Sequence, residues 1–189
     1  MPPKVKITKE EIVKSAIELV RSDGEGALNA RAIASSLNCS TQPVFSNFAT
    51  MEELKGAAIF AAYQIYQSFI NSEVSCGKYP RYKAFGMAYI RFAREEKELF
   101  KLLFMRDRTN EYFTPSADFY ESVQMIMKAN GVSEEVARLM HLELWTCVHG
   151  IGTMLATSFL PLDSELISNI LTDVYQGIRT RHLSEEKLR

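Results

Sequence analysis

The sequence is poor in several features that define large classes of protein. It contains only three cysteines in 189 residues, Cys39, Cys76 and Cys147, which lie far apart and form no CxxC pair. A disulfide framework and a zinc site are therefore not expected, and each cysteine is expected to be a small, fairly buried apolar residue. The longest apolar runs are broken by charge, and the opening segment MPPKVKITKEE lacks the apolar core of a signal peptide. The sequence thus predicts a cytoplasmic protein with no membrane partner.

An excess of positive charge is also missing. Lys and Arg number 22 against 23 Asp and Glu, which gives a formal net charge of -1. Because many DNA-binding proteins are basic overall, bulk charge does not argue for nucleic acid, and only a local face could bind it. With 47% hydrophobic and 24% charged residues, the composition is that of a soluble globular protein.

Motifs for catalysis and for cofactor or metal binding are likewise missing. No carboxylate pair, Ser-His-Asp set or glycine-rich phosphate loop stands out, so we expect neither an enzyme nor a bound cofactor. His141 and His149 are two helical turns apart and drift off one face, so they are not expected to form a metal pair. A small helical enzyme remains an improbable alternative.

Helical periodicity is what the sequence does contain. Apolar residues recur with helical spacing and strand-like alternation is nearly absent, which predicts an all-α protein. Capping residues, glycines and prolines mark the ends of the segments. The expected helices run from Thr8 to Asp23, from Asn29 to Leu37, from Ser40 or Thr41 to Phe48, from Thr50 to about Ser75, from Pro80 to Glu96, from Glu98 to Arg106, from Ser116 to Asn130, from Ser133 to Phe159 and from Asp163 to Arg181. We expect a loop at 107–115 and a frayed tail after His182.

Two of these segments form a helix-turn-helix pattern. The short helices 29–37 and 40–48 are joined by a tight turn at Asn38 and Cys39, and the second helix of such a pair enters the major groove of DNA. Pro43 fits the first turn of the second helix, where a missing N–H costs no intrahelical bond. Thr41 and Gln42 are therefore expected at the end that meets the bases.

The composition of this stretch suits DNA. Residues 29–50 contain no Asp or Glu, which would repel phosphate, although Arg31 is their only basic residue. The remaining polar residues are mostly short hydroxyl and amide side chains that can bond phosphate oxygens or base edges. Short helix pairs also occur in proteins that bind no DNA, so the pattern alone leaves a helical protein-interaction module as the alternative.

Residues 27–54, ALNARAIASSLNCSTQPVFSNFATMEEL, resemble the N-terminal domain of the TetR (tetracycline-repressor-like) family of transcription regulators. The residues that match the family pattern are Ala34, Leu37, Ser40, Val44, Phe45, Phe48, Glu53 and Leu54. The resemblance implies a DNA-binding domain at residues 1–50 and a ligand-binding and dimerisation domain at 51–189. The DNA-contacting residues that it implies are Arg31, Ser40, Thr41, Gln42, Pro43, Phe45, Asn47 and Lys55.

The chain departs from the family pattern in its phosphate-binding groups. Phe45 replaces the usual Tyr and loses a hydroxyl, Asn47 replaces a frequent His, and Met51 replaces a frequent Lys, although Lys55 lies one turn on. Because few cations displace counterions from DNA, we expect weak non-specific binding with a shallow salt dependence. Lys4, Lys6 and Lys9 could compensate.

Two further segments, AYIRFAREEKELFKLLF and LWTCVHGIGTML, resemble the C-terminal domain of a TetR subgroup marked by Trp145, His149 and Gly150. The resemblance implies a homodimer built from the last two long helices. Apolar stripes on these helices would form the interface, although an ordinary intrachain core is the alternative. The stripes consist of Val136, Met140, Leu144, Val148, Ile151 and Leu155 on the first helix and of Ile167, Ile170, Leu171, Val174 and Ile178 on the second.

Aromatic and Met side chains are dense in the middle of the chain. Apolar walls with a few polar groups suit small ligands, so some of these residues are expected to line an effector site, although packing is the alternative for each. The candidate ligand-binding residues are Tyr66, Tyr89, Phe92, Phe104, Met125, Trp145 and His149. The sequence thus predicts a regulator, by default a repressor, that binds a palindromic DNA operator as a dimer and is released by a small molecule.

Overall fold

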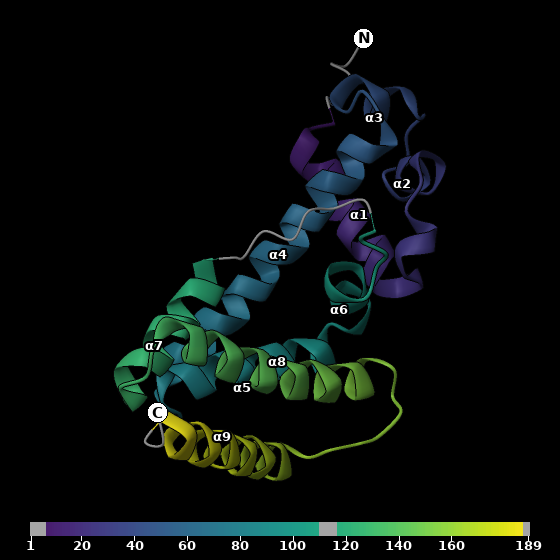
Figure 1. The fold of residues 1–189 in the computed structure, drawn as a ribbon. Coiled ribbons are helices and arrows are strands. Elements are labelled where there is room, and N and C mark those ends of the chain that lie inside the picture. The colour runs from purple at the N-terminus through teal and green to yellow at the C-terminus, as the bar shows by residue number, and fades with distance from the viewer. Residues whose placement is uncertain (1–6, 110–116, 187–189) are drawn as a thin grey trace. The chain divides into compact units, whose positions relative to one another are not determined.

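The computed structural model describes residues 7–109 and 117–186 (Figure 1), and in these ranges every regular element is a helix. The all-α prediction is confirmed. The elements are α1 (Lys9–Asp23), the 3-10 helix η1 (Glu25–Ala27), α2 (Ala30–Ser36), α3 (Gln42–Asn47), α4 (Met51–Cys76), α5 (Arg81–Glu95), α6 (Lys97–Phe104), α7 (Ala117–Asn130), α8 (Glu134–Ala156) and α9 (Ser164–Glu186). None of these helices has the length and apolar character that crossing a membrane requires. The predicted loop at 107–115 lies mostly outside the described residues.

The predicted helix starts rest on specific side chains. Thr8 accepts a hydrogen bond from the Glu11 amide at 3.2 Å, and the Glu11 carboxylate accepts one from the Thr8 amide at 2.8 Å, so the two side chains form a capping box at the start of α1. Asn29 caps α2 by accepting from the amide of Ala32 at 2.9 Å. Gly24 ends α1 with a φ of 78°, a backbone conformation that suits glycine.

The chain divides into two compact units, and α4 contributes to both. The first unit, here called the head, comprises residues up to Ser68 together with Glu95–Arg106, and so includes α6. The second, here called the body, comprises Phe69–Arg94 and the residues from Asp107 onward. The functional boundary expected after residue 50 stays a prediction.

The head has its own apolar core, contributed by α1 to α4. Its buried members are Ile12, Ala16, Ala30, Ile33, Ala34, Val44, Phe48, Leu54 and Ala58. The start of α6 is joined to α1 by Arg21, whose guanidinium donates to Glu96 at 2.9 and 2.7 Å and to Glu18 at 2.7 Å. Because these bonds are charge-assisted and one pair is bidentate, they fix the angle between the two helices better than a single contact would.

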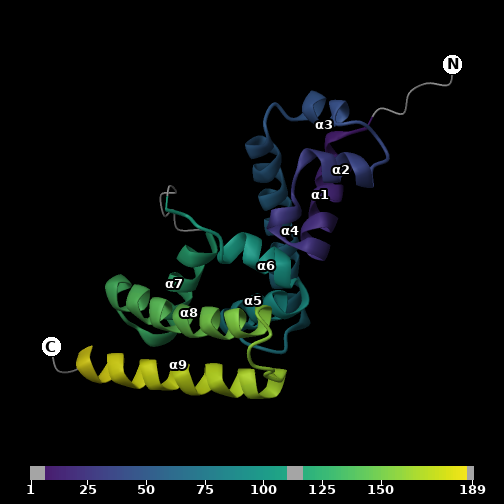
Figure 2. The same cartoon turned by 90° about the vertical axis from the view of Figure 1, so that its right-hand side faces the viewer.

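In the body, α7 packs against α8 and α8 packs against α9, and α8 and α9 lie side by side in both views (Figures 1 and 2). A Cβ atom on Gly86 of α5 would lie 3.3 Å from Cγ2 of Val148 and 3.5 Å from Cδ1 of Leu171. Glycine at this position therefore permits α5 to approach both long helices closely.

The predicted dimer stripes are largely the core of a single chain. On α8, Met140, Leu144, Val148, Ile151 and Leu155 are buried, and on α9, Ile167 and Leu171 are buried. The remaining stripe residues, Val136, Ile170, Val174 and Ile178, are partly buried. Val148 and Leu171 lie close to Gly86 of α5, and Val136, Met140 and Ile178 pack with Val123 and Ile126 of α7. The stripes therefore no longer support dimerisation, and a dimer interface would have to use other residues.

The expectation of a frayed tail after His182 is wrong for the described residues, because α9 continues to Glu186. His182 is buried at 4% exposure, and its Nε2 lies 3.1 Å from Oε2 of Glu143 on α8. Leu183 packs against the apolar cluster of α7 and α8. Tertiary contacts thus extend the helix beyond the last apolar residue of the predicted stripe.

A buried tyrosine and a histidine join α5 to α8. The Tyr82 hydroxyl lies 3.0 Å from Nδ1 of His141. Burial raises the pKa of Tyr82 and lowers the pKa of His141, which favours a hydrogen bond between a neutral phenol and a neutral imidazole. Phe119 of α7 stands edge-on to the imidazole, with 5.1 Å between ring centroids.

This pair makes stability depend on pH. Since the pKa of His141 is lower in the folded chain than its ordinary value of 6.5, the unfolded chain binds the proton more tightly. The contribution is fully present above about pH 6.5 and is lost as the pH falls through the interval between the two pKa values. We expect His141→Asn, which keeps an acceptor for Tyr82 but cannot titrate, to lose less stability than the wild type between about pH 7 and pH 5. Urea unfolding at several pH values measures this, and parallel curves for the two proteins would refute it.

Candidate functional site

The helix-turn-helix of the head is formed by α2 and α3 around a tight turn. Asn38 has a φ of 50°, which is uncommon outside glycine and tolerated best by Asn and Asp. The turn is closed by the amide of Cys39, which donates to the carbonyl of Ala34 at 2.9 Å. Val44 and Phe48, each 1% exposed, anchor α3 in the head core. The orientation of α3 is thus set by its buried side.

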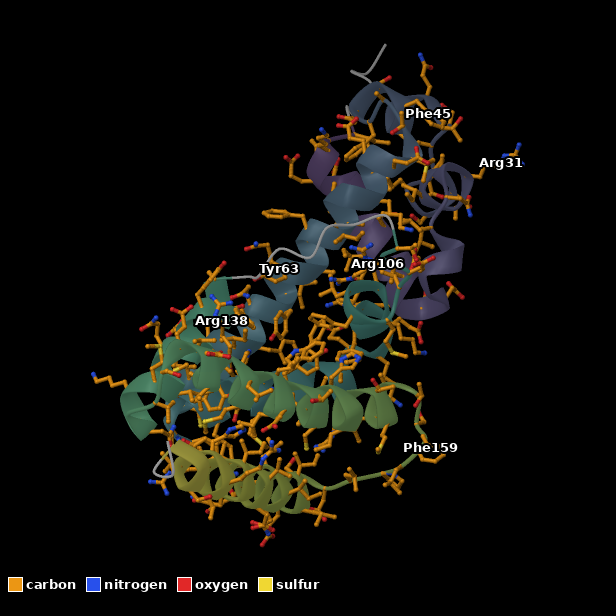
Figure 3. The ribbon with its side chains drawn as sticks, in the orientation of Figure 1. Arg31, Phe45, Tyr63, Arg106, Arg138 and Phe159 are labelled. Carbon is orange, nitrogen blue, oxygen red and sulfur yellow. The ribbon has the colours of Figure 1, made fainter. Side chains whose placement is uncertain are left out.

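The opposite side of α3 presents unlike groups to solvent. Phe45 is 51% exposed and Gln42 is exposed, while Arg31 is exposed on α2. Figure 3 shows Phe45 and Arg31 extending outward from the helix-turn-helix. Arg31 has no ion pair in the part of the chain that the structure describes. The site therefore offers an amide, an aromatic ring and a guanidinium to a partner.

Other predicted DNA-contacting residues are used differently within the head. Asn47 is half-buried, and its Nδ2 donates to the carbonyls of Pro43 at 2.8 Å and Ile7 at 3.3 Å. Thr41 precedes α3 without capping it through its side chain, and Ser40 is exposed. Pro43 stands in the first turn of α3, as predicted. The Asn47 amide thus bonds the segment before α1 to α3, a role that the local sequence does not indicate.

Lys55 lies one turn into α4 and forms an ion pair with Glu25 of η1. The two residues line a small cleft of about 120 Å³ together with Leu28, Met51 and Glu52. This volume is below the roughly 300 Å³ at which drug-sized ligand pockets begin. None of the predicted ligand-binding residues lines this cleft.

In the body, three of the predicted ligand-binding residues meet. The Tyr89 hydroxyl lies 2.7 Å from Nδ1 of His149, and the Trp145 indole is stacked on the same imidazole with 5.0 Å between centroids and 12° between planes. Burial raises the pKa of Tyr89 and lowers that of His149, which favours a neutral phenol bonded to a neutral ring. The Trp145 side chain is 43% exposed, so its indole can touch a ligand. Tyr89 is only 4% exposed and orients the His149 imidazole through their hydrogen bond.

The other predicted ligand-binding residues lie elsewhere. Phe92 is fully buried and packs edge-on against Phe69 at 5.3 Å, whereas Met125 is half-buried on α7. Tyr66 and Phe104 belong to the head, where their rings meet edge-on at 5.4 Å. The structure thus gathers Tyr89, Trp145 and His149 and does not add Phe92 to them.

The body exposes several large apolar side chains, of which the sequence patterns singled out only Trp145. They are Leu139, Leu142 and Trp145 on α8, Phe159 and Leu160 after it, and Leu166 on α9. Phe159 is 78% exposed and extends into solvent (Figure 3). The buried stripes already account for the helical spacing of apolar residues on α8 and α9. These exposed residues fall outside that spacing, so the pattern gave no reason to single them out. Several large apolar groups exposed on two adjacent helices mark a surface that suits a protein partner.

Comparison with known proteins assigns the segment from α5 into α9 to a family. The family model described as tetracyclin repressor-like, C-terminal domain, matches residues 82–175. This range extends from α5 into α9 and contains Tyr89, Trp145 and His149. No curated protein sequence matches the chain significantly.

Solved structures extend the likeness to most of the chain. A member of the TetR family from Streptomyces coelicolor A3 is 17% identical, with a TM-score of 0.60 over 88% of this chain and 96% of that chain. The multidrug binding protein EbrR, solved in complex with imidazole, is 18% identical, with a TM-score of 0.61 over 88% and 93% of the two chains. At these identities the likeness shows the fold, and the Trp-His-Gly subgroup stays a prediction. Residues 82–175 thus belong to the C-terminal domain of the TetR family, and the fold of most of the chain agrees with that assignment.

Proposed function

We propose that the protein is a ligand-responsive transcription regulator that binds a palindromic DNA operator as a homodimer and represses until a small molecule releases it. The observation that carries the proposal is the exposed face of α3, where Gln42 and Phe45 project from a helix anchored by Val44 and Phe48. In a helix-turn-helix, residues near the start of the second helix contact base edges. Family membership supports DNA binding over a module that binds only protein.

The head divides its contacts between bases and backbone. Gln42 can donate and accept together, which matches adenine in the major groove, and the exposed Phe45 ring can touch a thymine methyl group. Arg31 is on the preceding helix, which crosses the backbone, so its guanidinium is assigned to phosphate.

We expect Gln42→Ala to cost roughly 1–3 kcal/mol on the cognate operator and little on a scrambled duplex. Arg31→Ala should weaken both complexes about equally and lower the salt slope by roughly one. The operator is first selected from a random duplex pool, and fluorescence anisotropy at several salt concentrations then measures both variants. Full discrimination by Gln42→Ala, with loss of discrimination in Arg31→Ala, would reverse the two assignments. Failure of the wild type to select any sequence would favour the protein-interaction module.

Dimerisation is proposed to use the exposed apolar groups of α8 and α9. We expect light scattering at micromolar concentration to give twice the chain mass of 21.5 kDa. Leu142, at 55% exposure, is a central candidate because a charge there would be buried in the interface. Leu142→Glu should therefore shift the mass toward one chain, whereas Phe60→Glu, at an even more exposed position of the head, should not. A wild-type mass near 21.5 kDa would disprove the dimer.

Effector binding is proposed at Tyr89, Trp145 and His149. A ligand can release DNA only by as much as it prefers the non-binding conformer. Trp145 is the only tryptophan, so its emission reports directly on this site. A compound that dissociates the operator complex should shift Trp145 emission, and Tyr89→Phe should raise the concentration needed because the imidazole loses its hydrogen-bond partner. If Tyr89→Phe and Trp145→Phe respond to that compound as the wild type does, the effector binds elsewhere.

A further inference from the structure

Lys9 lies near the end of α3, and its side chain already forms an ion pair. Its Nζ lies 3.0 Å from Oε1 of Glu53 in the first turn of α4 and 4.6 Å from the centroid of the Phe48 ring, which follows α3. The Asn47 bond to the carbonyl of Ile7 holds the start of α1 at the same end of α3. These contacts bring together the starts of α1 and α4 and the end of α3, and Lys9 and Glu53 are both about half exposed there.

The Glu53 carboxylate is fixed by a second set of bonds. Its Oε2 accepts from the amide of Ala49 at 2.8 Å, while the amide of Glu53 donates to Oγ1 of Thr50 at 3.1 Å. The Ala49 amide, and then Lys9, hold the pKa of Glu53 below its usual value. The carboxylate is therefore charged at neutral pH and stays oriented toward Lys9.

We propose that Glu53 is a specificity-determining residue of the head, which pairs with Lys9 as a phosphate would and so withholds this cation from DNA. The proposal rests on the DNA-binding function proposed above. Each Lys or Arg that neutralises a phosphate releases counterions and strengthens binding to any sequence. Since specificity is a difference between affinities, lowering the non-specific term leaves discrimination to base contacts.

Withholding Lys9 from DNA has a large effect relative to the total positive charge of the head surface, because basic groups are few around the helix-turn-helix. Arg31 is the only Lys or Arg between residues 29 and 50. One additional cation at the end of α3 would therefore be a substantial share of the positive charge around the helix-turn-helix. Glu53 also differs from Glu52, the preceding residue, which has no ion pair in the described ranges.

The decisive variant is Glu53→Gln, whose side-chain oxygen can still accept from the Ala49 amide, with helicity checked by circular dichroism. We expect binding to a scrambled duplex to strengthen and the slope of log K against log salt to steepen by about 0.9. A fourfold rise in salt then costs about 3.5-fold more affinity than in the wild type. Operator binding should gain less, so the ratio of operator to scrambled affinity should fall.

Three further variants separate ion-pair release from other causes. Glu52→Gln removes the same formal charge one residue away and should leave the slope unchanged. Lys9→Gln leaves the α4 cap intact and should also keep the wild-type slope, because Lys9 releases no counterion while it is paired. The double variant Lys9→Gln with Glu53→Gln removes both charges of the neutral pair and should bind with the wild-type slope.

The outcomes distinguish this proposal from the proposed function. A slope lowered by about 0.9 in Lys9→Gln would mean that Lys9 already contacts phosphate in the wild type, which overturns the proposal. Equal effects of Glu52→Gln and Glu53→Gln would reduce Glu53 to a general surface charge and also overturn it. Wild-type binding with an unchanged slope in Glu53→Gln rejects this inference alone, whereas no binding by either protein rejects DNA binding itself.

Discussion

The reading helix α3 has only six residues and could not hold its conformation alone, because a helix this short is unstable in water. Burial of Val44 and Phe48 against Ile33, Leu54 and the rest of the head core supplies what hydrogen bonding along α3 cannot. Since side chains on a helix point in directions set by their spacing, anchoring these two residues decides which others face outward. The proposed contacts with DNA all depend on this burial.

The electrostatics of the head are unusual for a proposed DNA-binding surface. Lys9 and Lys55 are both paired with carboxylates of neighbouring elements. Exposed ion pairs of this kind contribute little to stability, since solvent screens them and side-chain entropy opposes them. Their effect on a polyanion can be greater, because a paired lysine must exchange one partner for another instead of only losing water. Selectivity would then come from lysines that are paired within the head as much as from base contacts.

The body combines an apolar core with two hydrogen bonds between polar side chains. Tyr89 with His149 and Tyr82 with His141 are two tyrosine–histidine bonds along the same pair of helices, α5 and α8. Buried polar groups are costly unless bonded, so each pair fixes the register of the two helices. The pair at His149 adds the exposed Trp145 ring, and this difference makes it the better candidate for sensing a ligand.

Local features followed from the sequence because they depend on residues near one another: the helix starts at Thr8 and after Asn29, the turn at Asn38 and the amphipathic helices. The mixed character of α3 was also predictable from Val44, Phe45 and Phe48. Contacts between distant segments were not, and Arg21 with Glu96, 75 residues apart, places α6 in the head without any local signal. Likewise, periodicity identified an apolar stripe on α8 but could not say what covers it. Only the tertiary structure decided that the same chain buries this stripe and leaves Leu142 and Trp145 exposed, because burial depends on which helices pack together.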